Sequence, residues 1–225
     1  MTTSGTSDFN LEFDDIIVEA YERCGMDVRD GYDMKTALRS VNLMFAEWAN
    51  RGLNLWTIEQ REQVLTAGVY QYALPLDTVD ALSAVIRTNA GTSTQQDITV
   101  DRIGYAEYLH VPNKNTQSRP AQWFLQRTTT PQLFLYPSPD ATQTYTFRYY
   151  AVRRIQDAGT FTNTADVVFR FLPCMVAGLA YYLSVKKAPD RVGLLKGMYD
   201  EEFQRAANED RENSGYFAVP MYQAR

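Results

Sequence analysis

Apolar residues recur at helical spacing near both ends of the chain. Two such segments precede residue 57 and two follow residue 157. A period of 3.6 residues in the apolar positions is typical of amphipathic helices that pack against one another. The four predicted helices run from about Leu11 to Cys24, from Met34 to Asn50, from a start between Asp166 and Pro173 to about Lys187, and from just after Pro189-Asp190 to about Ala206.

The second predicted helix carries its own start and stop signals. Asp33 stands where a helix N-cap is expected, and Gly52 stands where a left-handed residue would end the helix. Trp48 falls on the apolar face of this helix, so we expect it in the core. In the fourth predicted helix, Gly193 and Gly197 are four residues apart, and we interpret them as a close helix contact instead of a phosphate site.

The middle of the chain follows a different pattern. Between about Ile58 and Ile155, apolar and polar residues alternate in short runs separated by turn signals, which predicts β-strands. Thr128–Pro131 is typical of a hairpin loop, whereas Ile103–Leu109 fits one or two helical turns. The predicted strands lie at Tyr70–Leu74, Val79–Arg87, Asp97–Arg102, Trp123–Arg127, Gln132–Tyr136 and Tyr145–Val152.

Helices at the two ends and strands in the middle together predict an α+β fold. We expect an antiparallel bundle of about four helices built from both chain ends, residues 1–57 and 158–215. An antiparallel β region over residues 58–157 is expected to be inserted into this bundle. Residues 216–225 are expected to form an extended C-terminal tail.

The tail has an unusually apolar sequence. Exposed apolar groups gain nothing in water, whereas a large apolar side chain gains about 1.5–3 kcal/mol on full burial. We therefore expect the tail to occupy a groove on another chain, with folding back onto the helices of the same chain as the alternative. The residues concerned are Tyr216, Phe217, Val219, Met221 and Tyr222.

Composition and charge limit the possible functions. The chain has 225 residues, of which 45% are hydrophobic and 13% aromatic, and its formal net charge is -5. A conventional nucleic-acid binder needs a basic surface to displace counterions from phosphates, so the acidic balance argues against one. No apolar run approaches the roughly 20 residues of a membrane helix. The start, Met1–Asp8, has no secretory signal pattern.

The residue types needed for most catalytic sites are scarce. His110 is the single histidine, so histidine-rich zinc sites and histidine-dependent nucleophiles lack partners, and no nucleophile elbow or phosphate-binding glycine motif is present. Cys24 and Cys174 lie in apolar helical segments, where buried reduced thiols are favoured over a disulfide. We predict no enzymatic activity, no cofactor and no metal site.

One acidic cluster needs separate treatment. Asp27, Asp30 and Asp33 lie between the first two predicted helices and would hold a cation if their oxygens converged. Their spacing lacks the glycine and the terminal glutamate of a calcium loop. A solvated acidic turn that caps the helix is therefore the preferred interpretation.

An aromatic and basic stretch follows in the last predicted strand. Its sequence fits an alternating strand with arginines on the wet face, a protein interface, or a platform that stacks on single-stranded nucleic acid. The first is favoured, the second is retained, and the acidic charge makes the third the weakest. The candidate interface residues from this part of the chain are Tyr149, Arg153 and Arg154, together with Trp56.

Several motifs occur in a fixed order between the predicted helices. The second helix ends in Trp48-Ala49-Asn50-Arg51-Gly52-Leu53-Asn54-Leu55-Trp56. The β region then carries Tyr108, Pro112, Lys114, Arg119-Pro120, Trp123-Phe124, the segment from Leu133 to Asp140, and Tyr145 to Tyr150. In this order the motifs resemble the head-to-tail adaptors of short-tailed bacteriophages, the tail tubular protein A group. The resemblance runs from Asp14 to about Glu202.

The resemblance implies a virion structural protein without enzymatic activity. Such adaptors are expected to form a homo-oligomer, a dodecameric ring at the capsid vertex, with the portal protein above, the tail nozzle protein below and tail fibres at the side. The helices would meet the portal and neighbouring subunits, and the acidic channel would let DNA slide past without specific binding. The alternatives are another neck or tail component, such as a stopper or nozzle, and a virion-associated peptidoglycan hydrolase.

Overall fold

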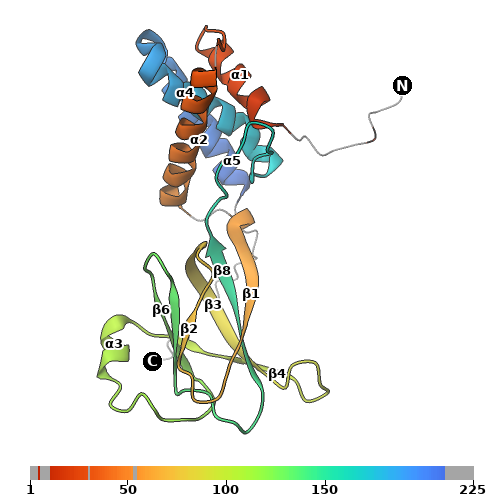
Figure 1. Ribbon diagram of the computed structural model, residues 1–225, viewed down its shortest axis with the longest axis vertical. Helices are drawn as coiled ribbons and strands as arrows, with labels where there is room; N and C mark the ends of the chain where they lie inside the picture. Colours follow the sequence, from red (N-terminus) through yellow and green to blue (C-terminus); the bar gives the residue numbers. More distant parts are fainter. Residues whose placement is uncertain (1–4, 6–10, 30, 53–54, 211–225) are drawn as a thin grey trace, which may run out of the picture. The chain divides into compact units, whose positions relative to one another are not determined.

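The computed structural model describes residue 5 and residues 11–29, 31–52 and 55–210. It contains helices and antiparallel sheets, which confirms the α+β class (Figure 1). The chain divides into two compact units. The helical unit consists of Met1–Asn50 and Asp157–Arg225, and the β unit consists of Arg51–Gln156.

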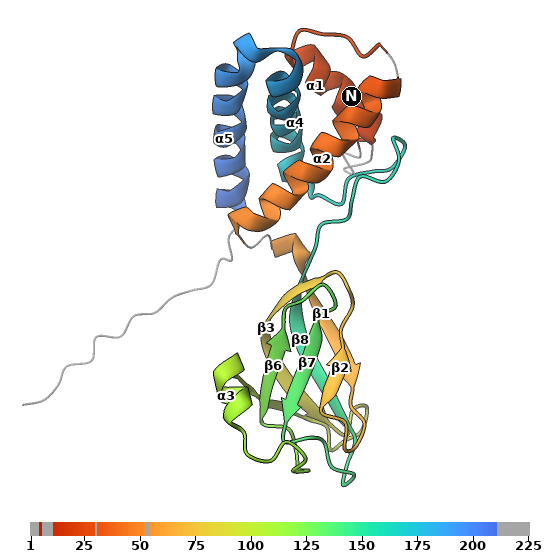
Figure 2. The ribbon, with the colours of Figure 1, turned by 60° about the vertical axis from the view of Figure 1, so that its left-hand side comes forward.

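The helical unit is built around one central helix that is apolar on all sides. Figure 2 shows this helix, α4, with α5 on one side and α1 and α2 on the other, and α4 packs against both α5 and α1. A helix without a polar face is stable in water only when other elements cover it. The helices are α1 (Phe13–Arg23), α2 (Gly31–Arg51), α4 (Leu172–Lys187) and α5 (Val192–Glu209), with the 3-10 turns η2 (Phe169–Phe171) and η3 (Pro189–Arg191) before α4 and α5.

A hydrogen-bonded network of large side chains lies in the core of the helical unit. Trp48 is 0% exposed, as its position on the apolar face predicts, and its indole N–H donates to the Tyr199 hydroxyl at 2.8 Å. The hydroxyls of Tyr199 and Tyr182 donate to the Glu47 carboxylate at 2.8 and 3.1 Å. The network links α2, α4 and α5, so the packing of these helices depends on polar as well as apolar contacts.

Two glycine predictions require correction. A Cβ at Gly193 or Gly197 would meet nothing within 4 Å, so these residues do not form the predicted close helix contact. The close contact is instead at Gly178 in α4, where a Cβ would lie 2.5 Å from the Met44 sulfur and 2.8 Å from the Tyr199 ring. Spacing along the helix reveals small residues but not the side of the helix that faces a neighbour.

The ends of α2 agree only partly with the sequence signals. Asp33 is not the N-cap, because α2 begins two residues earlier at Gly31. Its carboxylate accepts a hydrogen bond from the backbone N–H of Arg29 at 3.3 Å. The same carboxylate forms an ion pair with Lys187 of α4. Gly52 follows the last helical residue with a φ of +148°, a region that favours glycine.

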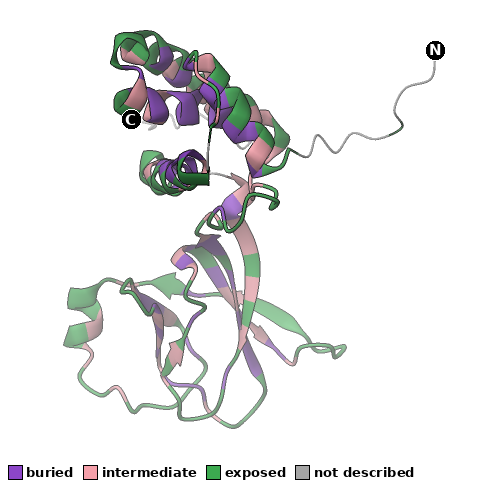
Figure 3. Cartoon of the chain, turned by 45° about the horizontal axis from the view of Figure 1, so that its top comes forward, coloured by how far each residue is buried: buried purple, intermediate pink, exposed green. Residues whose placement is uncertain are grey.

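The β unit consists of two four-stranded sheets that share one apolar core. The core takes side chains from both sheets, including Ile86 and Phe147 from one and Trp123 and Leu133 from the other, and Figure 3 shows buried residues along the strands. One sheet has the order β1 (Ile58–Val64), β8 (Tyr145–Arg153), β3 (Thr78–Thr88), β4 (Gln96–Thr99), and the other has the order β2 (Gln71–Ala73), β7 (Gln132–Tyr136), β6 (Gln122–Gln126), β5 (Asp101–Arg102).

Most strands match the alternating segments, with two differences. The strand β1 carries Glu, Gln and Arg on both faces, so its sequence lacks the alternation that identifies a half-buried strand. Among the described strands it lies at the edge of its sheet and pairs with β8. The segment predicted as one strand over Asp97–Arg102 forms β4 and β5, which belong to different sheets, and β5 pairs with β6 in parallel.

The two local predictions between the strands are confirmed. The hairpin loop at Thr128–Pro131 connects β6 and β7, which pair antiparallel. The segment that fits helical turns contains the short helix α3 (Tyr105–His110).

Candidate functional site

The described residues offer no arrangement typical of catalysis at the positions considered from the sequence. His110 is exposed at the end of α3. Within the described ranges, no group of three or more His, Cys, Asp or Glu is placed to hold a metal ion. Of the acidic cluster, Asp30 lies outside the described residues and Asp33 is paired with Lys187.

Both cysteines are buried and in the reduced form. The Cys24 thiol donates to the carbonyl oxygen of Ala180 at 3.3 Å, which attaches the end of α1 to α4. Burial raises the pKa of the Cys24 thiol, so the reactive thiolate is disfavoured. Cys24 therefore contributes to packing between the helices.

The aromatic and basic stretch of β8 is an alternating strand. Tyr149 is 3% exposed and packs against Phe147 in the shared core, so its side chain is not on a surface that a partner would meet. Arg153 Nε lies 2.5 Å from the Glu59 carboxylate of β1. Arg154 is exposed, and Trp56 is half-buried in the 3-10 turn η1 (Leu55–Thr57).

Ion pairs lie on both faces of the sheet formed by β1, β8 and β3, because Arg61 is opposite the core residue Tyr149 whereas Arg148 is the next residue along β8 and faces the other side. Arg61 on β1 forms ion pairs with the carboxylates of Asp77 at 2.6 Å and Glu59 at 3.1 Å. Arg148 on β8 forms an ion pair with the Glu62 carboxylate at 2.6 Å. The hydrogen bond from Arg61 lowers the pKa of Asp77, although burial of that carboxyl opposes the effect. These arginines are engaged within the sheet, which weakens any role for them in binding nucleic acid.

An apolar hollow of about 520 Å³ lies where α3 packs against the sheet of β6 and β7. Phe124 and Phe134 line it, and the ring centroid of Tyr108 is 5.7 Å from that of Phe124 and 5.4 Å from that of Phe134. Tyr105 is 62% exposed and Leu109 is 73% exposed at its edge. The helical spacing of Tyr105, Tyr108 and Leu109 is visible in the sequence, whereas the pairing of the strands that complete the surface is not.

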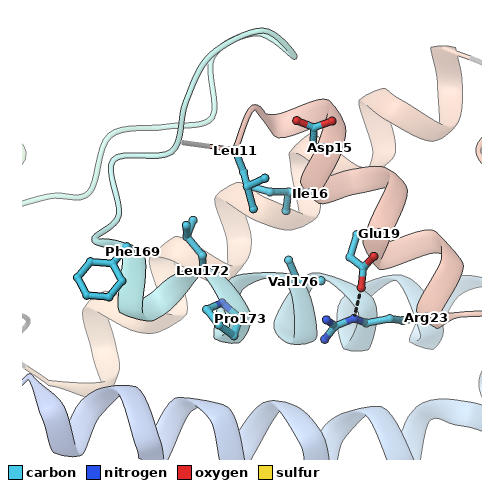
Figure 4. A pocket seen from close by; sticks show the side chains of 9 residues that line it. All are labelled: Leu11, Asp15, Ile16, Glu19, Arg23, Phe169, Leu172, Pro173 and Val176. Atoms are coloured by element: carbon cyan, nitrogen blue, oxygen red, sulfur yellow. Dashed lines mark hydrogen bonds and ion pairs between the residues drawn. The ribbon is translucent and has the colours of Figure 1, made fainter. Parts of the chain in front are cut away.

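A larger apolar groove lies on the helical unit between α1 and the start of α4. Figure 4 shows its side chains, and its volume is about 950 Å³. Phe169 at one end is 62% exposed, and the ion pair between Glu19 and Arg23, 2.9 Å apart, lies at the other. Asp15 adds a second carboxylate to the rim. The apolar lining residues are Leu11, Ile16, Phe169, Leu172, Pro173 and Val176.

The outer surface of α5 is also partly apolar. Leu194 is 68% exposed and Met198 is 41% exposed. They lie one turn apart, next to Gly193 and Gly197, which have open space at the Cβ position. This combination of apolar side chains and glycines lets another helix or strand approach closely.

The candidate residues in the tail, Tyr216–Tyr222, lie outside the described residues. In the part of the chain that the structure describes, no helix is both long enough and apolar enough to cross a bilayer.

Comparison with known proteins gives one family. The sequence matches the SU10 adaptor protein family over residues 12–222. The match includes residues of both units and extends through the candidate tail residues. None of the curated proteins compared with the chain matches it. The family is one of phage adaptors, which confirms the predicted class of structural protein at that level.

Proposed function

The chain belongs to the SU10 adaptor protein family, and we propose that it is a head-to-tail adaptor of the tail tubular protein A type. In this role it forms a dodecameric ring at the capsid vertex, joins the portal protein to the tail nozzle and fibres, and continues the DNA channel. The family match over residues 12–222 is the observation that carries the proposal.

The distribution of exposed apolar surface supports this function. The helical unit has the groove beside α4, and the β unit has the hollow beside α3. Exposed apolar surface of this kind is typical of sites that meet other proteins. Separate surfaces on two compact units suit a protein that binds one partner with each.

We assign the surfaces to partners by unit. The helical framework, residues 1–57 and 158–215, meets the portal and neighbouring subunits, and the inserted β region, residues 58–157, meets the nozzle or a fibre. The tail, residues 216–225, adds contacts through Tyr216, Phe217, Val219, Met221 and Tyr222. Trp56, Arg153 and Arg154 are further candidates.

The proposal treats DNA as a passing molecule. The net charge of -5 supports a channel that repels phosphates, and the arginines of β1 and β8 are paired with carboxylates. Such a lining lets DNA move during ejection without being held.

Reconstitution with the purified portal protein of the same phage tests the proposal. Electron microscopy of the mixture should show a ring of this chain closed on one end of the portal. A stopper or nozzle would bind only after another adaptor is present. A peptidoglycan hydrolase would instead degrade cell wall, and the activity would be lost on changing one carboxylate. The adaptor assignment is overturned if the chain does not bind the portal and either binds only after another adaptor is added or degrades cell wall.

A further inference from the structure

The groove on the helical unit has apolar walls and no described segment of the chain fills it. Its apolar side chains come from α1, α4, the turn before α4 and Leu11 just before α1, with the Asp15 carboxylate and the ion pair of Glu19 and Arg23 on the rim. Phe169 is 62% exposed, and Leu11 is 38% exposed. An occupant must therefore be apolar along its length and tolerate carboxylates at its edge.

The described chain ends beside one end of this groove. Asp210, directly after α5, is 6% exposed, and its carboxylate forms an ion pair with Arg170. Arg170 follows Phe169 in the 3-10 turn, so the ion pair holds the start of the following segment close to the groove. Tyr216 is six residues farther along, a span of at most about 20 Å.

The sequence after Asp210 has the chemistry that the groove requires. Residues 216–222 read Tyr-Phe-Ala-Val-Pro-Met-Tyr and include no charged side chain. In an extended segment alternate side chains point to the same side, so Phe217, Val219 and Met221 would enter the groove together. Tyr216 and Tyr222 would then lie on the opposite side of the segment, facing away from the groove. Seven extended residues span about 20 Å, comparable with the roughly 16 Å length of the eleven-residue α1.

We propose that in the free subunit the groove between α1 and α4 holds Tyr216–Tyr222 of the same chain. The position of Asp210 favours the same chain over a second copy, because the segment is tethered within reach. This contact does not depend on the role in a virion. If the proposed adaptor function is also correct, a partner that binds the segment must first displace it from the groove.

Disulfide trapping in the isolated full chain tests the contact. The test variant combines Asp15→Cys on the groove rim with Val219→Cys in the segment. The matched control combines Glu201→Cys with Val219→Cys. Glu201 is exposed on α5, outside the groove, and lies nine residues, about 14 Å, before Asp210. A freely moving tail would react with the control position at least as readily. The native Cys24 and Cys174 are 3% and 1% exposed, so they should not compete.

The groove pair should form an intrachain disulfide at least about tenfold faster than the control pair, independent of protein concentration, because a docked segment raises the local thiol concentration. Adding Phe217→Asp and Met221→Asp to the groove pair should return the rate to that of the control. Equal rates for the two pairs would overturn the proposal. A disulfide that forms only between chains would also overturn it and would assign the groove to a second copy. Since no portal is used, these outcomes are independent of the test of the adaptor function.

Discussion

Individual residues show which interactions a linear pattern can predict. Trp48 is predictable as core because it falls on an apolar stripe, and it is fully buried. Its hydrogen bond to Tyr199 was not predictable, because the partner is 151 positions away. The same applies to Asp33, whose partner Lys187 is on α4. The residues of the core follow from the pattern, whereas their polar partners follow from the tertiary arrangement.

The hydroxyl of Tyr199 should be important for stability. Tyr199→Phe leaves the Trp48 indole N–H and part of the Glu47 carboxylate without this partner, at a cost of about 1–3 kcal/mol. Urea unfolding would measure the change. Tyr181→Phe is the matched control, since that ring stacks on Tyr199 but its hydroxyl is outside the network. An equal change in both variants would contradict the role of the network.

Glycine substitutions in two helices should have opposite effects. Gly178→Ala places a methyl group 2.5 Å from the Met44 sulfur and should destabilise the helical unit by about 1–3 kcal/mol. Gly193→Ala and Gly197→Ala meet no atoms within 4 Å and should stabilise α5 by about 1 kcal/mol at most. Thermal unfolding of the three variants would show the difference. A loss of stability at the α5 positions would mean that this face is already packed.

At the scale of elements, amphipathic helices were easier to predict than edge strands. The helices α1, α2 and α5 are amphipathic, so apolar periodicity marks them directly, whereas α4 is marked by a nearly continuous run of apolar residues. The strand β1 is held by backbone hydrogen bonds and ion pairs to β8, and its polar sequence carries no such signal. Alternation also does not reveal the division between β4 and β5, because the sheet that each strand joins depends on its pairing partner.

The ion pair of Arg61 and Asp77 should make the β unit sensitive to acid. The folded-state pKa of Asp77 is lowered, so its contribution is present above the ordinary carboxyl pKa of about 4 and is lost as pH falls through the lower folded value. Asp77→Asn should therefore lower the free energy of unfolding at pH 7 and reduce the further decrease of that free energy below pH 4. Arg61→Gln should do the same, and the double variant should show non-additivity in urea unfolding from pH 7 to pH 2. Additive effects would show that the pair is not coupled.

At the scale of the whole molecule, two compact units each expose an apolar surface, as a protein that joins two partners requires. The hollow beside α3 could be predicted only in part, because Phe124 and Phe134 come from strands whose pairing completes it. The family match and the order of motifs agree at the level of a phage adaptor. The ring and its neighbours remain our proposal.

A charge in the hollow of the β unit should affect binding of the nozzle or fibre protein without affecting binding of the portal. Leu109→Asp places a carboxylate at the edge of the hollow and should abolish binding of the nozzle or fibre protein while rings still form on the portal. Leu76→Asp is the matched control, since Leu76 is 64% exposed on the same unit and is not among the residues that line the hollow. Sedimentation of the purified components would measure both steps. Equal loss of nozzle or fibre binding in the two variants would remove the hollow from the interface.

A density map of the virion neck would locate the chain directly. As an adaptor, the chain should form a closed ring between the portal and the tail nozzle, with helical units against the portal and β units toward the nozzle or fibres. Density for the chain elsewhere in the virion, or a neck in which another protein occupies that ring, would rule out the adaptor role.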